Sequence, residues 1–198
     1  MSWPEVILAS ASPRRLELLR QIGIEPTVEP ADVDETLDPG ADLAVAVVEL
    51  ARAKADAVAR SRLLLSDRPI EAVVIGADTL VVVDGEPLGK PASPADAAAM
   101  LRRLSGRSHQ VMTGVAVVHL TSGRTLDAVA TTDVHVRAIT DDEIDAYIAT
   151  GEPFDKAGAY AIQGRAAVFV EGISGDHSNV VGLPLPLVDR LLRTLRQA

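Results

Sequence analysis

The chain has 198 residues, a formal net charge of −9, 47% hydrophobic residues and no cysteine. The length and hydrophobic content are typical of a globular domain with a sizeable core, and the lack of cysteine excludes disulfides, thiolate zinc sites and a cysteine nucleophile. The acidic charge and the aromatic content of 3% argue against a nucleic-acid surface that neutralises phosphates or stacks bases.

The sequence predicts neither a targeting segment nor a membrane span. Met1–Glu5 lacks the basic start of a secretory signal. The longest apolar run, Val73–Val83, contains Asp78 and is shorter than the ~20 residues that a transmembrane helix requires. We therefore expect a cytoplasmic protein with no membrane partner.

The N-terminal part predicts a strand, a helix and an extended segment. Val6–Ala9 is a short apolar run with a β-branched start, which is typical of a strand. Ser12 and Pro13 resemble a helix N-cap followed by proline at the first helical position. Gly23 is a typical helix stop, and Thr27–Val33 follows as an extended segment.

A longer amphipathic helix follows. Its apolar face is formed by residues at helical spacing, namely Leu43, Val47, Leu50, Lys54 and Val58. Lys54 is unexpected on such a face. It could extend from the edge of the core to solvent, or its ammonium could lie in a cleft and face an anion.

The rest of the chain alternates between strands and helices. The predicted strands are Ala72–Ile75, Leu80–Val83, Val111–Leu120, Thr125–Val136 and Ala166–Val170. Helices are predicted from Ser93 to about Leu104, from Thr140 to about Gly151 and from about Leu185 to Arg196, the first two with capping-box patterns. Asp84–Gly85 and Ser122–Gly123 are typical hairpin turns. We expect an α/β fold in which helices flank a mixed sheet.

Two adjacent arginines stand at the start of the first helix. Arg14 and Arg15 oppose the positive end of the helix dipole unless an anion binds there. Phosphate suits this position, because helix N-termini bind it and arginine grips it with two hydrogen bonds. The alternative is an ordinary capped helix with solvated arginines.

Asp78 interrupts the most apolar stretch of the chain. A carboxylate there is costly unless it is paired, bound to a metal or placed where a strand meets solvent. Gly76 and Ala77 leave room for a ligand or a backbone to approach. We interpret Asp78 as a catalytic or metal-binding residue; the alternative is a turn that joins two strands. Lys90, which follows the hairpin, could point back towards Asp78.

The segment Asp155–Gly164 is rich in small residues and predicts a loop that leads into a strand. Gln163 in this loop offers both a donor and an acceptor to a nucleotide base, although a surface glutamine would look the same. The four histidines lack zinc-ligand spacing, and the sequence contains no Walker loop, GxGxxG or GxSxG motif.

Several of these segments, in this order, resemble the Maf family of nucleoside triphosphate pyrophosphatases over nearly the whole chain. The matching segments are Leu8–Arg15, Val33–Glu35, Leu50–Ala55, Ile75–Thr79, Leu88–Pro91, His109–Gly114, Asp155–Gly164 and Asn179–Pro184. The resemblance implies a single domain, residues 1–198, in which two lobes enclose a cleft, with a fold similar to that of inosine-triphosphate pyrophosphatase. It also implies hydrolysis between the α- and β-phosphates, a divalent cation such as Mg²⁺ or Mn²⁺, and a homodimer.

The resemblance assigns a role to each matching position. Asp78 matches the catalytic carboxylate that activates water. The phosphate-binding positions are Ser12, Arg14, Arg15, Lys54 and Lys90, and the metal-binding positions are Glu35 and Asp78. The positions that distinguish the dTTP- and UTP-preferring branch are Arg14, Thr79 and Gln163. The segment Gly175–Asn179 departs slightly from the family pattern, which leaves the breadth of substrates open.

Three functions are compatible with the sequence. The first is an enzyme that releases pyrophosphate from dTTP or UTP. The second is a non-catalytic nucleotide-binding regulator of septum formation, against which the presence of Asp78, Lys54 and Lys90 argues. The third is a metal-dependent phosphatase that releases orthophosphate, but the Asp-x-Asp motif of one large phosphatase class is absent at Asp78.

Overall fold

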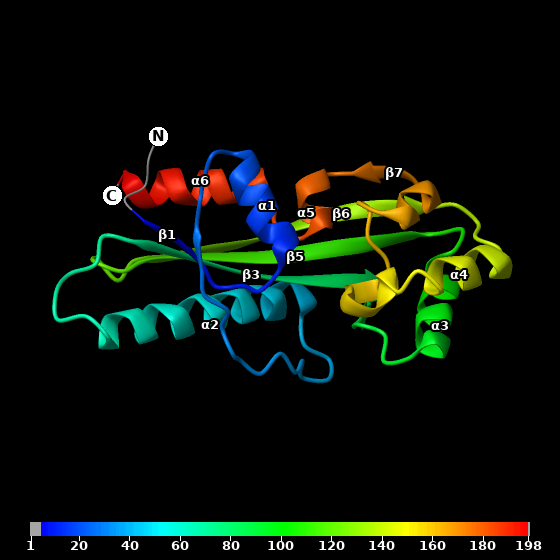
Figure 1. Cartoon of the computed structure of the whole chain (residues 1–198), viewed down its shortest axis with the longest axis horizontal. Coiled ribbons are helices and arrows are strands. Elements are labelled where there is room, and N and C mark those ends of the chain that lie inside the picture. Colours follow the sequence, from blue (N-terminus) through cyan, green and yellow to red (C-terminus); the bar gives the residue numbers. More distant parts are fainter. Residues whose placement is uncertain (1–4, 198) are drawn as a thin grey trace. The chain divides into compact units, whose positions relative to one another are not determined.

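The computed structural model describes residues 5–197. Most of Met1–Glu5, on which the prediction of no secretory signal rests, lies outside this range. The strands are β1 (Val6–Leu8), β2 (Thr27–Val28), β3 (Val73–Val83), β4 (Glu86–Leu88), β5 (Ser108–His119), β6 (Thr125–Val136) and β7 (Val170–Ser174). The helices are α1 (Pro13–Gln21), α2 (Leu43–Leu64), α3 (Pro94–Leu104), α4 (Asp141–Ile148), α5 (His177–Val181) and α6 (Leu185–Arg196) (Figure 1). Three short 3₁₀ helices are η1 (Glu152–Asp155), η2 (Ala157–Ala159) and η3 (Arg165–Phe169).

The strands form one sheet of seven, in the order β2-β1-β3-β5-β6-β7, with β4 paired to β3. β1 is parallel to both β2 and β3, whereas β4 is antiparallel to β3 and β7 is antiparallel to β6. The expected α/β fold with a mixed sheet and flanking helices is confirmed.

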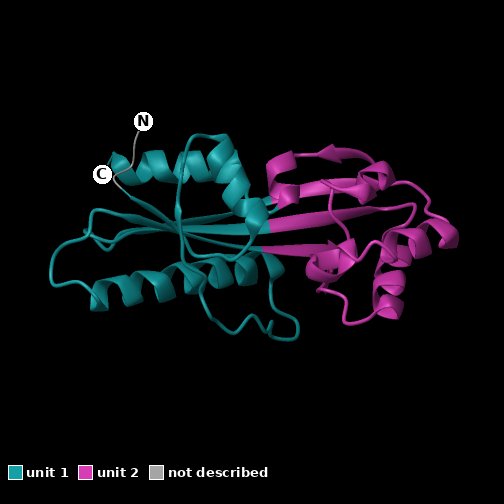
Figure 2. Ribbon diagram, in the orientation of Figure 1, with its two compact units in different colours: residues 1–78, 113–130, 182–198 teal, residues 79–112, 131–181 magenta. Residues whose placement is uncertain are grey.

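The chain divides into two compact units (Figure 2). Unit 1 contains residues 5–78, 113–130 and 182–197, and unit 2 contains residues 79–112 and 131–181. Each unit has its own cluster of buried apolar side chains. The strands β3, β5 and β6 each contribute residues to both units.

In unit 1, α2 packs very closely on the sheet. A Cβ atom added to Gly76 of β3 would lie 2.2 Å from the carbonyl oxygen of Ala51, and one added to Gly114 of β5 would lie 2.2 Å from that of Val47. Side chains at these positions would push the helix away from the sheet. The room that the sequence predicts around Gly76 is therefore taken by the backbone of α2.

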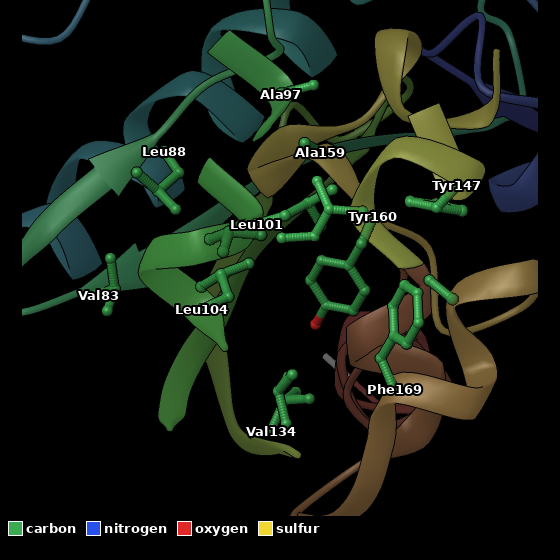
Figure 3. Packing of buried hydrophobic residues seen from close by; sticks show 14 of the residues in the cluster. Val83, Leu88, Ala97, Leu101, Leu104, Val134, Tyr147, Ala159, Tyr160 and Phe169 are labelled. Carbon is green, nitrogen blue, oxygen red and sulfur yellow. The ribbon is translucent and has the colours of Figure 1, made fainter. Parts of the chain in front are cut away.

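Unit 2 is built around a core that includes most of the chain's few aromatic rings (Figure 3). Tyr147 of α4 meets Phe169 of η3 edge to face, with the ring centroids 5.6 Å apart. Tyr160 lies in the same cluster, and its hydroxyl is 2.7 Å from Nε2 of the buried His109. Burial lowers the pKa of His109 to about 4 and raises the pKa of Tyr160, so both rings are neutral at pH 7.

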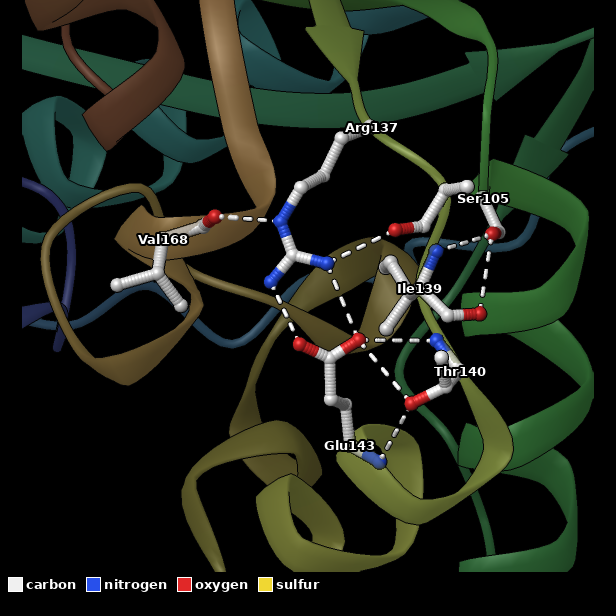
Figure 4. Close-up of polar contacts among 7 residues, drawn as sticks. Ser105, Arg137, Ile139, Thr140, Glu143 and Val168 are labelled. Carbon is white, nitrogen blue, oxygen red and sulfur yellow. Dashed lines mark hydrogen bonds and ion pairs between the residues drawn. The ribbon is translucent and has the colours of Figure 1, made fainter.

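The capping box predicted for α4 is present (Figure 4). The Thr140 hydroxyl accepts a hydrogen bond from the backbone N–H of Glu143, whose carboxylate accepts one from the Thr140 N–H. Arg137 donates to both oxygens of the Glu143 carboxylate and to the carbonyl oxygen of Val168. The guanidinium of Arg137 lowers the pKa of Glu143 to about 2. These contacts join the start of α4 to η3.

Two predicted boundaries are wrong. Ala72–Ile75 and Leu80–Val83 are not two strands, because β3 runs without interruption from Val73 to Val83. Asp78 is thus not a turn residue, and an ion pair with Lys54 compensates the burial of its carboxylate. The predicted strand Ala166–Val170 is also wrong.

The segment before β7 is a 3₁₀ helix, η3, and the strand begins only at Val170. Ala166 and Phe169 are buried, whereas the two residues between them are exposed. This spacing of three suits a 3₁₀ turn and does not match the alternation of a half-buried strand. The same correction applies to Asp155–Gly164, which is a loop with 3₁₀ turns but leads into η3 instead of a strand.

None of the helices within residues 5–197 combines the length and the hydropathy of a membrane span.

Candidate active site

The candidate site of unit 1 is built where α2 crosses β3. Gly76 and Asp78 are two residues apart on a strand, so both face the same side of the sheet. The close contact at Gly76 shows that this side is covered by α2. Ala51, Lys54 and Ala55 share one face of α2, at spacings of three and four residues. Close packing of the helix thus brings Lys54 over Asp78.

Lys54 is held between two carboxylates. Its Nζ lies 2.6 Å from Oδ1 of Asp78 and 2.5 Å from Oε1 of Glu35. The Lys54 side chain is 9% exposed and that of Asp78 13%, whereas that of Glu35 is 57% exposed. The interpretation of Lys54 as a lysine that reaches solvent from the core edge is therefore wrong. Its ammonium is buried and faces anions supplied by the chain itself.

Arg15 is the second anchored cation of this unit. Its Nε donates to the carbonyl oxygen of Gly182 at 2.9 Å, and its Nη1 donates to the hydroxyl of Ser10 at 3.0 Å. Burial lowers the pKa of Arg15, and the negative charges of Asp78 and Glu35 oppose this shift. The guanidinium therefore lies within electrostatic reach of both carboxylates that hold Lys54.

The helix α1 begins where the sequence predicts, with Ser12 and Pro13 at the predicted positions. Ser12 is the N-cap residue with an extended backbone, and Pro13 is the first helical residue. The Ser12 side chain makes no capping hydrogen bond, and its N–H donates to the hydroxyl of Ser10 at 3.2 Å. Arg14 is partly buried and acts on the pKa of Arg15 as a nearby like charge. The helix end therefore carries two cations and the Ser12 hydroxyl, which does not cap it.

The other predicted residues belong to unit 2. Thr79 follows Asp78 on β3 and is partly buried, while Lys90 and Gln163 are exposed. The segments of Lys90 and Gln163 are connected, because the N–H of Gly158 donates to the carbonyl oxygen of Gly89 at 3.0 Å. Unit 1 therefore brings together Ser12, Arg14, Arg15, Glu35, Lys54 and Asp78, whereas Thr79, Lys90 and Gln163 lie in unit 2.

Sequence reasoning did not identify the two residues that bind the Arg15 guanidinium. Ser10 is buried and bonds to Arg15, and the carbonyl oxygen of Gly182 reaches Arg15 from 167 positions along the chain. Both residues lie inside segments that carry the family resemblance. That location is the only sequence signal for them, because neither a small hydroxyl nor a backbone carbonyl has a pattern of its own.

Glu35 and Asp78 are the two carboxylates of this site that could hold a divalent cation. Each brings one oxygen to Nζ of Lys54, so a cation would bind through the second oxygen of each carboxylate, and hard oxygen ligands are those that Mg²⁺ and Mn²⁺ prefer. Within residues 5–197, no group of three or more histidine, aspartate and glutamate side chains is arranged to hold a metal ion. The protein could therefore supply two ligands, and substrate phosphates and water would supply the rest, which is the usual way that Mg²⁺ is bound.

The chain as a whole matches a known protein family. The family model described as "Maf-like protein" matches residues 5–195. This chain belongs to the Maf family.

Relatives within the Maf family cover almost the whole chain. A dTTP/UTP pyrophosphatase of Moorella thermoacetica is 54% identical over 188 residues, which are 95% of this chain and 93% of that protein. A dTTP/UTP pyrophosphatase of Anaeromyxobacter dehalogenans is 51% identical and covers 96% of this chain and 93% of its own length. A third dTTP/UTP pyrophosphatase, from Symbiobacterium thermophilum, is 54% identical over 91% of this chain and 89% of its own length.

Proposed function

We propose that this chain is a nucleoside triphosphate pyrophosphatase that hydrolyses dTTP and UTP to the monophosphate and pyrophosphate. The observation that carries the proposal is the sequence identity to dTTP/UTP pyrophosphatases: about half of the residues are identical over more than nine-tenths of the chain. The cations and carboxylates gathered in unit 1 support it, because such a set suits a triphosphate and a water nucleophile.

Each residue of the unit 1 site has a role in this proposal. The phosphates are bound by Ser12, Arg14, Arg15 and the N-terminus of α1. Asp78 accepts the proton of the attacking water. Lys54 holds the Asp78 carboxylate in place, and its positive charge offsets the charge that develops on the leaving pyrophosphate.

We also propose that Mg²⁺ or Mn²⁺ takes part. Glu35 and Asp78 would hold the cation together with the substrate phosphates. When bound, the cation would polarise the phosphate oxygens and neutralise their charge.

Unit 2 contributes the remaining proposed contacts. Lys90 binds phosphate, whereas Thr79 and Gln163 act with Arg14 to select the base. Gln163 is exposed in its loop and offers both a hydrogen-bond donor and an acceptor, as recognition of a pyrimidine edge requires. The proposal further includes a single functional domain, a homodimer and a place in the cytoplasm. It also includes no nucleic-acid partner, because a net charge of −9 repels the phosphate backbone.

One assay tests the function. The purified protein is incubated with Mg²⁺ or Mn²⁺ and a panel of nucleoside triphosphates, and pyrophosphate and orthophosphate are measured separately. We expect pyrophosphate, released fastest from dTTP and UTP, and no turnover by the Asp78→Asn variant. Orthophosphate as the first product would indicate the phosphatase. Tight nucleotide binding without turnover would indicate the non-catalytic regulator.

A further inference from the structure

Glu152, at the start of η1, accepts hydrogen bonds with both carboxylate oxygens, one from a residue of α4 and one from the first residue of η3. Oε1 accepts a hydrogen bond from the hydroxyl of Tyr147 at 3.0 Å, and Oε2 accepts one from the backbone N–H of Arg165 at 3.1 Å. Arg165 is the second residue after Gln163. The carboxylate therefore connects α4 to the end of the loop that carries the proposed base-reading glutamine.

The same carboxylate lies against Gly164, the residue directly after Gln163. A Cβ atom at Gly164 would stand 2.2 Å from Oε1 of Glu152 and 2.7 Å from its Cδ. Gly164 has a φ of 171°, an extended conformation that any residue can adopt. A side chain at position 164 would therefore have to displace the Glu152 carboxylate, although the backbone conformation there would accept one.

The other end of the loop is fixed independently. Tyr160 is buried, and its hydroxyl lies 2.7 Å from Nε2 of His109. Between Tyr160 and Gly164 stand only Ala161, Ile162 and Gln163. Gln163 thus lies in a segment of three residues that is held at one end by Tyr160 and at the other end by the carboxylate of Glu152.

Glu152 is itself held by rigid neighbours. Tyr147 packs edge to face on Phe169, with the ring centroids 5.6 Å apart. Burial, together with the nearby Glu152, raises the pKa of Tyr147, so its hydroxyl stays protonated and keeps donating. Lys156 donates to the backbone carbonyl oxygen of Glu152 at 2.7 Å.

We infer that Glu152 is a positioning residue for base selection, which acts by fixing the backbone at Gln163. This inference rests on the proposed function. An exposed glutamine can select a base only if its backbone is held in place, because small displacements of a recognition group weaken its hydrogen bonds steeply. Glu152 does not need to touch the nucleotide to have this effect.

The test compares variants that loosen this support in different ways. Glu152→Gln removes the charge and one acceptor, Gly164→Ala displaces the carboxylate while Glu152 is retained, and Tyr147→Phe removes only the hydroxyl donor. Asp141→Asn is the control, because it changes a carboxylate of α4 that pairs with Arg102 at 2.8 Å, outside the loop that carries Gln163. Thermal unfolding of each variant shows that it is folded at the assay temperature.

The readout is the ratio of kcat/KM for dTTP to kcat/KM for dGTP. We expect Glu152→Gln and Gly164→Ala to lower this ratio about tenfold, Tyr147→Phe to lower it less, and Asp141→Asn to leave it unchanged. Adding Glu152→Gln to Gln163→Ala should produce no further fall in the ratio, since the effect passes through Gln163. An unchanged ratio in both Glu152→Gln and Gly164→Ala would overturn the inference.

A second readout separates this inference from the proposed function. Equilibrium dissociation constants are measured for the non-hydrolysable α,β-methylene analogues of dTTP and dGTP. If the wild-type protein releases no pyrophosphate from any triphosphate, the proposed function fails. The dissociation constant of the dGTP analogue divided by that of the dTTP analogue then decides the role of Glu152: a ratio that falls in the variants supports it, and an unchanged ratio overturns it.

Discussion

The ammonium of Lys54 and the carboxylate of Asp78 meet at 2.6 Å, although the two residues are 24 positions apart and both are buried. A helix and a strand that pack without intervening side chains make this contact possible, since Gly76 allows the backbone of α2 to approach β3. The ion pair therefore joins the local packing of unit 1 to its proposed chemistry. Buried pairs are costly to break from one side, because the remaining charge stays in the protein without a partner.

We predict that Lys54→Met removes catalysis and lowers the free energy of unfolding by about 3–5 kcal/mol, because Asp78 remains buried without its partner. Urea denaturation and pyrophosphate release measure the two effects. Arg52→Met is the control on the same helix. Its exposed pair with Asp127 should contribute at most about 1 kcal/mol.

The double variant Lys54→Met and Asp78→Leu separates stability from catalysis. Apolar replacement of both charges should recover much of the lost stability, while activity stays absent. If Lys54→Met alone unfolds at the same urea concentration as the wild type, the pair does not contribute to stability.

Arg15→Lys should weaken substrate binding although the positive charge is kept. Lysine cannot donate to the Gly182 carbonyl and the Ser10 hydroxyl with the planar geometry of a guanidinium. We expect KM for dTTP to rise about tenfold with a smaller change in kcat. Arg20→Lys, on the exposed side of α1, should leave both constants unchanged. A similar effect of both substitutions would refute a special role of Arg15.

Gly76→Ala should damage unit 1 as a whole. The new methyl group would lie 2.2 Å from the carbonyl oxygen of Ala51, so α2 must move away from β3 and carry Lys54 with it. We expect a loss of about 1–3 kcal/mol in the free energy of unfolding, together with lower activity. Gly172→Ala is the control, because the nearest atom to its added Cβ would be 4.0 Å away. Equal urea midpoints for the two variants would contradict this packing argument.

Glu35→Gln should weaken the response to the divalent cation. Substitution leaves the size of the side chain unchanged but removes the charge that the cation needs. In a titration of activity with Mg²⁺, we expect half-maximal rates at about tenfold higher concentration. Asp34→Asn changes the adjacent carboxylate, which accepts a hydrogen bond from the Thr36 N–H, and should not shift the titration. Identical Mg²⁺ curves for the wild type and Glu35→Gln would remove Glu35 from the metal site.

The pKa of His109, lowered to about 4 by burial, predicts how stability depends on pH. Above about pH 6.5 the ring is neutral in both the folded and the unfolded chain, so it contributes no pH dependence. Between about pH 6.5 and 4 the unfolded chain binds a proton that the folded chain excludes. The free energy of unfolding should therefore fall with falling pH, by at most about 1.4 kcal/mol per pH unit from this residue.

His109→Gln should flatten this dependence, whereas His177→Gln, at an exposed position, should not. Urea denaturation at pH 7, 6 and 5 measures the difference. If wild-type and His109→Gln proteins lose stability in parallel over this range, His109 is not the residue that responds to pH.

The sequence by itself determined the order of most secondary-structure elements. It also identified the charged residues that stand on apolar faces or at the start of a helix. Helix caps, hairpin turns and apolar spacing arise from interactions between near neighbours, so Thr140, Glu143 and the stripe around Lys54 could be predicted locally. The same reasoning failed where it ended one strand at Ile75 and began another at Leu80, and it failed at Ala166–Val170. Both segments have partners from another part of the chain: Lys54 pairs with Asp78 in the middle of β3, and Glu152 accepts a hydrogen bond from the N–H at the start of η3.

Only the tertiary structure decided which charges meet. Lys54 could have faced solvent or a ligand, and the structure pairs it with Asp78 and Glu35. Arg15 is fixed by a carbonyl group 167 positions away, which has no signal in the sequence. Such contacts depend on how closely helices and strands pack, and packing is a property of the whole chain and not of a local pattern.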